Sequence, residues 1–322
     1  MGVRGSLQSV RMATIPADRP HLEGTVLDHV AHAVPRWQDV WGRYAADLGA
    51  VWASGGPGPG FAPGQLRFAN GSRVEVLMPW DVEVNDFLVR FLARSGPGPH
   101  HLTFKVPDIR HAIEEARRFG IDPINIDLSG PEWMEAFLHP KQSGGVVVQL
   151  AEQRHAWSSP PPDDYPTDLR VRLDGSGPTA PATLERVCHV VADLDAARGL
   201  FAGLLAGEVA GEGSEHGLHW VDLRWPGPLG LRLVGAEDGA VAGPVADWLG
   251  GLPGRVHHLA LETEEPEAVP GTRPVTPGIA TLDGGPDHDS MVEIAADDNC
   301  GLALVLRGFG GTSGSTAGGP VA

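Results

Sequence analysis

The sequence is poor in cysteine, in positive charge and in long apolar runs, and each scarcity argues against a class of protein. Two cysteines among 322 residues cannot form a disulfide framework or a cysteine-based zinc knuckle, so we expect a cytoplasmic setting. The 24 Lys and Arg face 41 Asp and Glu, and the net charge of −17 disfavours nucleic acid and membrane surfaces as partners. No apolar run approaches the roughly 20 residues of a membrane span. We therefore expect a small-molecule substrate and a monomer or homodimer.

The length of the chain and its segments rich in Pro, Gly and Ser predict two domains. A chain of 322 residues with 42% hydrophobic residues fits about two domains with real cores. Segments rich in Pro, Gly and Ser at 158–166 and 174–183 are typical of a linker. The predicted order is a flexible extension (1–24), a first domain (25–153), a linker (154–183), a second domain (184–308) and a disordered tail (309–322).

The two predicted domains repeat one another. The segments LDHVAHAV (27–34) and HHLTFKV (100–106) return as LERVCHVV (184–191) and HHLALET (257–263). His29 and His101 stand 72 positions apart, and so do Arg186 and His258. This agreement in spacing predicts a duplicated fold rather than two unrelated domains.

Each domain also divides in half. A strand-like run at 27–34 precedes apolar residues at helical spacing between Trp37 and Leu48. The plan restarts at 100–106, after which Asp108 is suited to cap a helix that runs to Phe119. Further strands are expected at 65–69, 73–78, about 121–127, 133–138 and 145–151. The order β-α-β-β-β is therefore expected twice per domain, giving an α+β fold.

Alternation along these strands brings polar residues to one face. Successive strand residues point to opposite faces of a sheet. The core face is assigned to Val26, Val30, Val34, Val74, Val76, Met78, His100, Leu102, Phe104, Val106, Val146, Val148 and Leu150, with His32 also in the core. The opposite face then carries His29, Glu75, His101 and Gln149, with Leu27, Ala31 and Ala33 beside His29. Two imidazoles, a carboxylate and an amide oxygen suit Mn, Fe, Co, Ni or Zn with positions open for substrate.

These segments, together with VEVLMP, GPGPHHLTFKVPDI and FLHPKQSGGVVVQL, resemble the vicinal oxygen chelate superfamily of glyoxalases, bleomycin resistance proteins and extradiol dioxygenases. The resemblance is closest to methylmalonyl-CoA epimerase-like proteins, strong over about 27–153 and weak over about 184–307. It implies two tandem domains, each of paired βαβββ modules whose sheet curls around a cavity. It also implies a divalent metal held by His29, Glu75, His101 and Gln149.

The resemblance is incomplete at the proposed proton-transfer residues. The epimerase pattern has an amide at the second ligand position and a glutamate at the fourth, and here Glu75 and Gln149 exchange these types. The family's proposed bases fall at Gln65 and Gln149, and a glutamine cannot accept a proton usefully near neutral pH. Glu75 and Gln149 therefore remain the candidate catalytic positions, and Glu75 could act as a base only if it left the metal.

The second domain lacks this ligand set. Its counterparts are Arg186, Arg232, His258 and Val305, and the two arginines disfavour a cation. The second domain is then either a scaffold or a site for an anionic group held by bidentate arginines. Cys188 and Cys300 need be no more than small hydrophobic residues.

The expected function is that of a metal-dependent enzyme with one site in the first domain. A metal that chelates a carbonyl-containing substrate acidifies the adjacent C–H, which suits an epimerase, isomerase or lyase. One alternative is an Fe(II)-dependent extradiol-type dioxygenase, given the two histidines and one carboxylate. Another is a non-catalytic protein that binds a small molecule or confers resistance to it.

Overall fold

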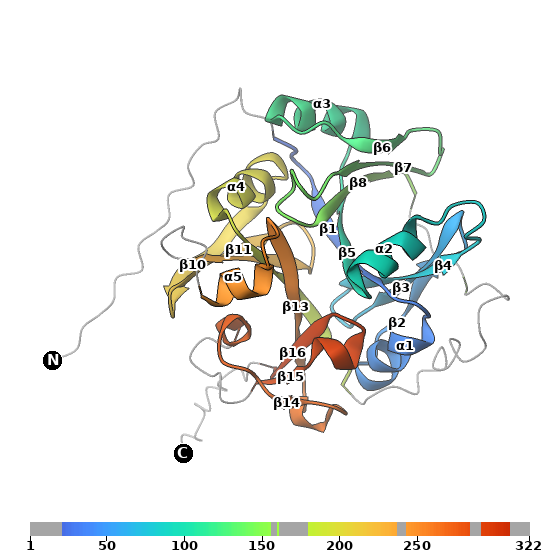
Figure 1. Ribbon diagram of the computed structural model, residues 1–322. Helices are drawn as coiled ribbons and strands as arrows, with labels where there is room; N and C mark the ends of the chain where they lie inside the picture. The colour runs from blue at the N-terminus through green and yellow to red at the C-terminus, as the bar shows by residue number, and fades with distance from the viewer. Residues whose placement is uncertain (1–20, 156–159, 161–179, 237–242, 284–290, 310–322) are drawn as a thin grey trace, which may run out of the picture.

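A computed structural model describes residues 21–155, 160, 180–236, 243–283 and 291–309. Most of the predicted extension, linker and tail lies outside these described residues. Two eight-stranded mixed sheets make up the fold (Figure 1). The first contains β1 (Val26–Ala33), β2 (Val51–Gly55), β3 (Gly60–Arg67), β4 (Arg73–Trp80), β5 (Gly98–Lys105), β6 (Ile124–Asp127), β7 (Trp133–Leu138) and β8 (Val147–Gln153). The second contains β9 (Thr183–Val191), β10 (Glu208–Glu215), β11 (Leu218–Arg224), β12 (Gly230–Ala236), β13 (Gly254–Thr263), β14 (Arg273–Pro274), β15 (Val292–Ile294) and β16 (Ala303–Gly308).

Both sheets have the same topology. The strand order is β2-β3-β4-β1-β5-β8-β7-β6 in the first and β10-β11-β12-β9-β13-β16-β15-β14 in the second. In each sheet the two halves meet at a central antiparallel pair, β1 with β5 or β9 with β13. Three halves are β-α-β-β-β modules, and in the fourth the 3-10 turn η4 (Pro266–Ala268) takes the place of the α-helix. The predicted fold of two tandem vicinal-oxygen-chelate domains with curled sheets is confirmed.

The helices are short. They comprise α1 (Gln38–Trp41), α2 (Phe87–Ser95), α3 (Ile109–Phe119), α4 (Leu194–Arg198) and α5 (Pro244–Leu249), with π-helical turns η1 (Gly42–Asp47) and η3 (Gly199–Leu204) and 3-10 turns η4 (Pro266–Ala268), η5 (Ile279–Asp283) and η7 (Ala296–Asn299). Asp108 caps α3 as predicted, because its side chain accepts from two backbone N–H groups of the first turn. Within the described ranges, no helix is long and apolar enough to cross a membrane.

Two elements of the first domain were not predicted. Strand β2 supplies the second strand of the first module, and helix α2 links the two modules. The apolar residues of α2 lie on one side of the helix, where Leu88 is buried beside Ala31, Ala33 and Leu77. Helix α2 therefore covers part of the sheet face that carries His29 and Glu75.

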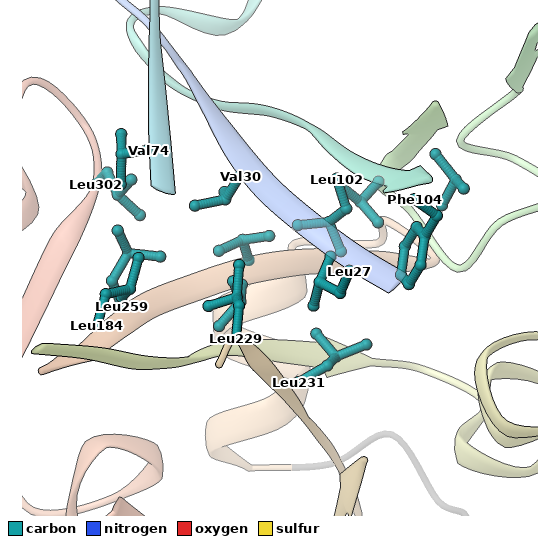
Figure 2. Close-up of a cluster of buried hydrophobic side chains, with 14 of the residues drawn as sticks. Leu27, Val30, Val74, Leu102, Phe104, Leu184, Leu229, Leu231, Leu259 and Leu302 are labelled. Atoms are coloured by element: carbon teal, nitrogen blue, oxygen red, sulfur yellow. The ribbon is translucent and has the colours of Figure 1, made fainter. Parts of the chain in front are cut away.

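Strict alternation was wrong at two residues, and a β-bulge explains each error. The pairing of β1 with β5 shifts between Leu27 and His29, which turns Leu27 onto the core face beside Val30 (Figure 2). A second shift leaves His100 outside the regular register, half-buried and with its ring centroid 4.6 Å from that of Phe91. A bulge adds one residue to one strand and so reverses the faces that follow. Val26, predicted to point inward, is only half-buried.

One hydrophobic core joins the two domains. Leu27, Leu102 and Phe104 of the first domain belong to the same cluster of buried residues as Leu231 and Leu259 of the second (Figure 2). The two sheets therefore turn these faces toward each other, and their opposite faces lie outside the shared core.

Buried histidines bridge the same interface from both sides. Nε2 of His32 donates to the carbonyl oxygen of Cys300 at 2.9 Å, and Nε2 of His189 donates to that of Gly144 at 2.8 Å. The two histidines hold matching positions in the repeat. The backbones also approach closely here, since a Cβ on Gly254 would lie 1.8 Å from the oxygen of Gly144.

Candidate metal centre

Three neighbouring strands bring His29, Glu75 and His101 together. His29 lies on β1, Glu75 on β4 and His101 on β5. Ala31 is the Cα partner of Glu75 on one side and of His101 on the other, so its small side chain separates the two larger ones. The three side chains converge because they share the sheet face opposite the core.

The distances between the polar atoms suit a common ligand. One nitrogen or oxygen from each of the three residues lies within 4.8 Å of the others. Oε2 of Glu75 is 3.6 Å from Nε2 of His29 and 3.6 Å from Nε2 of His101. Both histidines are almost fully buried. The arrangement is thus a compact set of two imidazoles and one carboxylate.

A hydrogen bond at Nδ1 orients each of the two imidazoles. Nδ1 of His29 lies 2.8 Å from Oδ2 of Asp28, whose other oxygen accepts from Nζ of Lys105 at 2.7 Å. Nδ1 of His101 lies 2.8 Å from Nδ1 of His100. Metal-binding histidines characteristically use one nitrogen for the ion and the other for such a partner. In both residues this arrangement directs Nε2 into the site.

The electrostatics couple the three groups. Burial alone would lower the pKa of His29, but Glu75 and Asp28 raise it to about 9. Burial alone would raise the pKa of Glu75, but the neighbouring histidines, chiefly His29, lower it to about 2. Burial and the adjacent His100 lower the pKa of His101 well below its ordinary value. Glu75 is therefore a carboxylate in this site, and His101 is a neutral imidazole.

This donor set fits a divalent transition metal. In the described part of the chain, Nε2 of His101 is buried without a hydrogen-bond partner. An unpaired buried nitrogen is costly, and it is the kind of group that a metal ion would satisfy. A neutral imidazole, a second imidazole and a carboxylate are typical ligands of Fe, Co, Ni, Mn or Zn.

Gln149 lies beside this set, with both ends of its amide engaged. Its Oε1 accepts from Oγ1 of Thr103 at 2.5 Å, and its Nε2 donates to Oε2 of Glu135 at 2.7 Å. The same Thr103 oxygen lies 2.9 Å from Nε2 of His29. Gln149 is thus within reach of the site, but its oxygen already serves as an acceptor.

Gln65 supports the carboxylate from the other side of the site. Its Nε2 donates to Oε1 of Glu75 at 3.3 Å, and its Oε1 accepts from Ser54 at 3.2 Å. Gln149 thus occupies the face predicted for it, and Gln65 reaches the same site. Gln65 holds the carboxylate of Glu75, and Gln149 holds that of Glu135. A glutamine can fill this role without gaining or losing a proton.

Sequence reasoning missed Glu135. It lies on β7 with a half-buried side chain, and it also accepts from Nε1 of Trp133 at 2.8 Å. Burial raises its pKa above the ordinary value. The signal was available, because Met134, Ala136 and Leu138 alternate into the core and leave Glu135 on the face of the site. The alternation pattern did not predict Asp28 at the site, because the bulge at this point interrupts the alternation.

Comparison with known proteins shows what the first domain is similar to. Residues 28–137 match the model of the Glyoxalase/Bleomycin resistance protein/Dioxygenase superfamily. The match spans most of the first domain. A mitochondrial methylmalonyl-CoA epimerase of Homo sapiens is 27% identical over 163 residues, which cover 47% of this chain and 89% of the relative.

Solved structures extend the likeness in fold to most of the chain. A mutant of 4-hydroxymandelate synthase from Streptomyces coelicolor matches with a TM-score of 0.58 and 15% identity, over 88% of this chain and 92% of that one. Methylmalonyl-CoA epimerase from Mycobacterium tuberculosis matches 45% of this chain and 95% of its own, with 23% identity and a TM-score of 0.38. The first of these shows that the fold of two tandem domains is shared over most of the chain.

The second domain carries a different set of side chains on the equivalent face. Arg232 makes a bidentate pair with Asp222, with both N–O distances 2.7 Å, and Nε of Arg186 donates to Oδ1 of Asp283 at 2.7 Å. Asp283 also contacts Nε2 of His258. Carboxylates of the chain thus already pair with both arginines, so the sequence-based reason for expecting an external anion is removed.

Proposed function

We propose that this protein is a divalent-metal-dependent enzyme that chelates a carbonyl-containing small molecule and promotes proton transfer beside the carbonyl. The observation that carries the proposal is the convergence of His29, Glu75 and His101 within 4.8 Å. These three would hold the ion, with the amide oxygen of Gln149 next to them. When bound, the ion supplies Lewis-acid polarisation of a carbonyl oxygen, which makes the adjacent C–H more acidic.

The chain's own residues supply the proton acceptor. Glu75 belongs to the ligand set, and Asp28 is engaged by His29 and Lys105. Glu135 has a raised pKa because it is partly buried, and Gln149 holds it toward the site. A carboxylate whose pKa moves toward neutrality is a better general base and acid. We assign proton transfer to Glu135, with Gln149 as the residue that positions it.

An epimerase, isomerase or lyase follows from this chemistry. The superfamily match and the likeness to a methylmalonyl-CoA epimerase support an epimerase on a thioester substrate. The cytoplasmic location remains a prediction from the two free cysteines. Monomeric and homodimeric states are both compatible with this proposal, because all the assigned residues come from one domain.

Metal content and hydrogen exchange test the proposal together. The native chain is expected to hold a divalent metal and to exchange the α-hydrogen of methylmalonyl-CoA with deuterium from D2O. In His101→Ala the ion bound with His29 and Glu75 is lost and exchange stops, while circular dichroism stays native because the sheet does not depend on the ion. Exposed His111 offers the matched control, and His111→Ala keeps both properties. Native metal stoichiometry in His101→Ala would refute the ligand assignment.

A second candidate is an Fe(II)-dependent dioxygenase. The set of two histidines and one carboxylate favours it, since this combination with open positions suits non-haem iron. It predicts iron as the bound metal and substrate-dependent oxygen consumption, measured with an oxygen electrode on the iron-loaded chain. Deuterium exchange without oxygen consumption supports the proton-transfer enzyme instead.

A further inference from the structure

A second cluster of metal-ligand side chains lies in the second domain. Cys188, His258 and Asp283 each offer one ligand atom, and these atoms lie within 4.8 Å of one another. All three residues are buried, with exposed fractions of 0%, 0% and 3%. A thiol, an imidazole and a carboxylate that converge away from water are an unusual combination for a hydrophobic core, where polar groups need partners.

The strand register shows how this cluster replaces the first site. Cys188 on β9 is the Cα partner of His258 on β13, just as Ala31 is the partner of His101 in the first sheet. The position that holds a small spacer in the first domain therefore holds a sulfur ligand in the second. The third ligand, Asp283, comes from η5, between β14 and β15.

His258 is oriented in the same way as His101. Its Nδ1 lies 2.7 Å from Nδ1 of His257, which repeats the 2.8 Å contact between His100 and His101. Nε2 of His258 consequently faces the cluster, where it contacts Asp283. The second domain thus repeats the orienting histidine of the first-domain site together with the inward-facing one.

The two arginines do not leave this cluster with an excess of positive charge. Arg232 is paired with Asp222, and Oδ1 of Asp283 accepts from Arg186 at 2.7 Å and from Arg232 at 3.1 Å. The carboxylates of Asp222 and Asp283 therefore offset the two guanidinium groups. The other oxygen of Asp283, Oδ2, is directed at His258. A bound cation would replace this contact, with Oδ2 of Asp283 and Nε2 of His258 as two of its ligand atoms.

We propose that Cys188, His258 and Asp283 form a second metal site, distinct from that of the first domain and selective for thiophilic divalent ions such as Zn2+ or Co2+. Thiolate and imidazole together favour these ions over Mg2+ or Mn2+. Coordination would release to solvent both the thiol proton of Cys188 and the Nε2 proton that His258 shares with Asp283, and the ion would take their place. Because the ligands are buried, the site is structural: it ties η5 to the central strands of the second sheet.

Cobalt provides the test because it reports on sulfur directly. The full-length chain, freed of metal by a chelator, is titrated with Co2+ and followed by near-ultraviolet absorption and by bound cobalt per chain. The expected result is two ions per chain and a thiolate-to-cobalt charge-transfer band. Cys188→Ala is expected to lose the band and one ion, and to keep the ion of the first domain, which also shows that the variant is folded.

Two further variants separate this site from the first one. Cys300→Ala removes the other free cysteine and should keep the band and both ions. His101→Ala should keep the band and lose the ion of the first domain alone. Absence of the band in the native chain, or two ions in Cys188→Ala, would overturn the second site and leave the proposed enzymatic site untouched.

Discussion

At the scale of single residues, the first-domain site depends on pairs in which one side chain orients another. Asp28 holds His29, His100 holds His101, and Gln149 holds Glu135. Each pair consists of a residue at the site and a neighbour that fixes its geometry. Mutation of the neighbours should change affinity or rate without removing a ligand, because partners of this kind tune the ligand atoms that they orient.

Glu135 gives the sharpest residue-scale prediction. Glu135→Gln keeps an acceptor oxygen for Nε2 of Gln149 and removes the basic carboxylate. Deuterium exchange into methylmalonyl-CoA should fall by about 100-fold or more, since positioned general bases contribute factors of that order. Metal content should not change. The exposed Glu132 serves as the control, and exchange in Glu135→Gln equal to that in Glu132→Gln would exclude Glu135 as the base.

At the scale of helices and strands, β-bulges and helix caps modify the repeated β-α-β-β-β module. The bulge at Asp28 lets Leu27 enter the shared core while His29 faces the site, which uninterrupted alternation would forbid. The α3 helix is bounded by Asp108 at its start and by Gly120, in the left-handed region with φ of 99°, at its end. Both helix boundaries follow from local residues, whereas the bulge depends on the partner strand.

The cap of α3 provides a prediction for this scale. Asp108→Ala leaves the N–H groups of Arg110 and His111 without their acceptor, at 2.9 and 3.0 Å in the native chain. The unfolding free energy should fall by about 1 kcal/mol, measured from urea midpoints at unchanged slope. Asp122 forms an exposed ion pair with Arg117, so Asp122→Ala should change the unfolding free energy by less than about 0.5 kcal/mol. Equal losses in both variants would argue against the cap.

At the scale of the whole molecule, we expect the two domains to unfold as one cooperative unit. They share a hydrophobic core, and His32 and His189 reach across the interface to backbone oxygens. Burial lowers the pKa of each of these histidines to about 4. His32 also meets the hydroxyl of Tyr44 at 2.9 Å, so both of its ring nitrogens are engaged in the neutral form.

Because the pKa values of these histidines are lowered, we expect the folded protein to lose stability in acid. Between about pH 6.5 and 4 the unfolded chain binds protons that the folded interface does not, so stability falls as the pH falls through this window. Each histidine contributes on the order of 2 kcal/mol between about pH 6.5 and 5. His189→Gln should therefore show a shallower pH dependence of its urea midpoint than the native chain. The exposed His111→Gln should match the native slope, and identical slopes in all three would contradict the assignment.

The sequence by itself determined the duplicated βαβββ plan and the sheet face on which His29, Glu75 and His101 lie. Spacing and alternation are local properties, so they can be read without knowing any contact. Tertiary structure alone decided the bulges that moved Leu27 and His100, because register depends on a strand some 70 positions away. It also decided that Asp283 joins Cys188 and His258, and that both domains share one core. Those contacts join residues distant in the chain, and packing and charge pairing select them only after the sheets have formed.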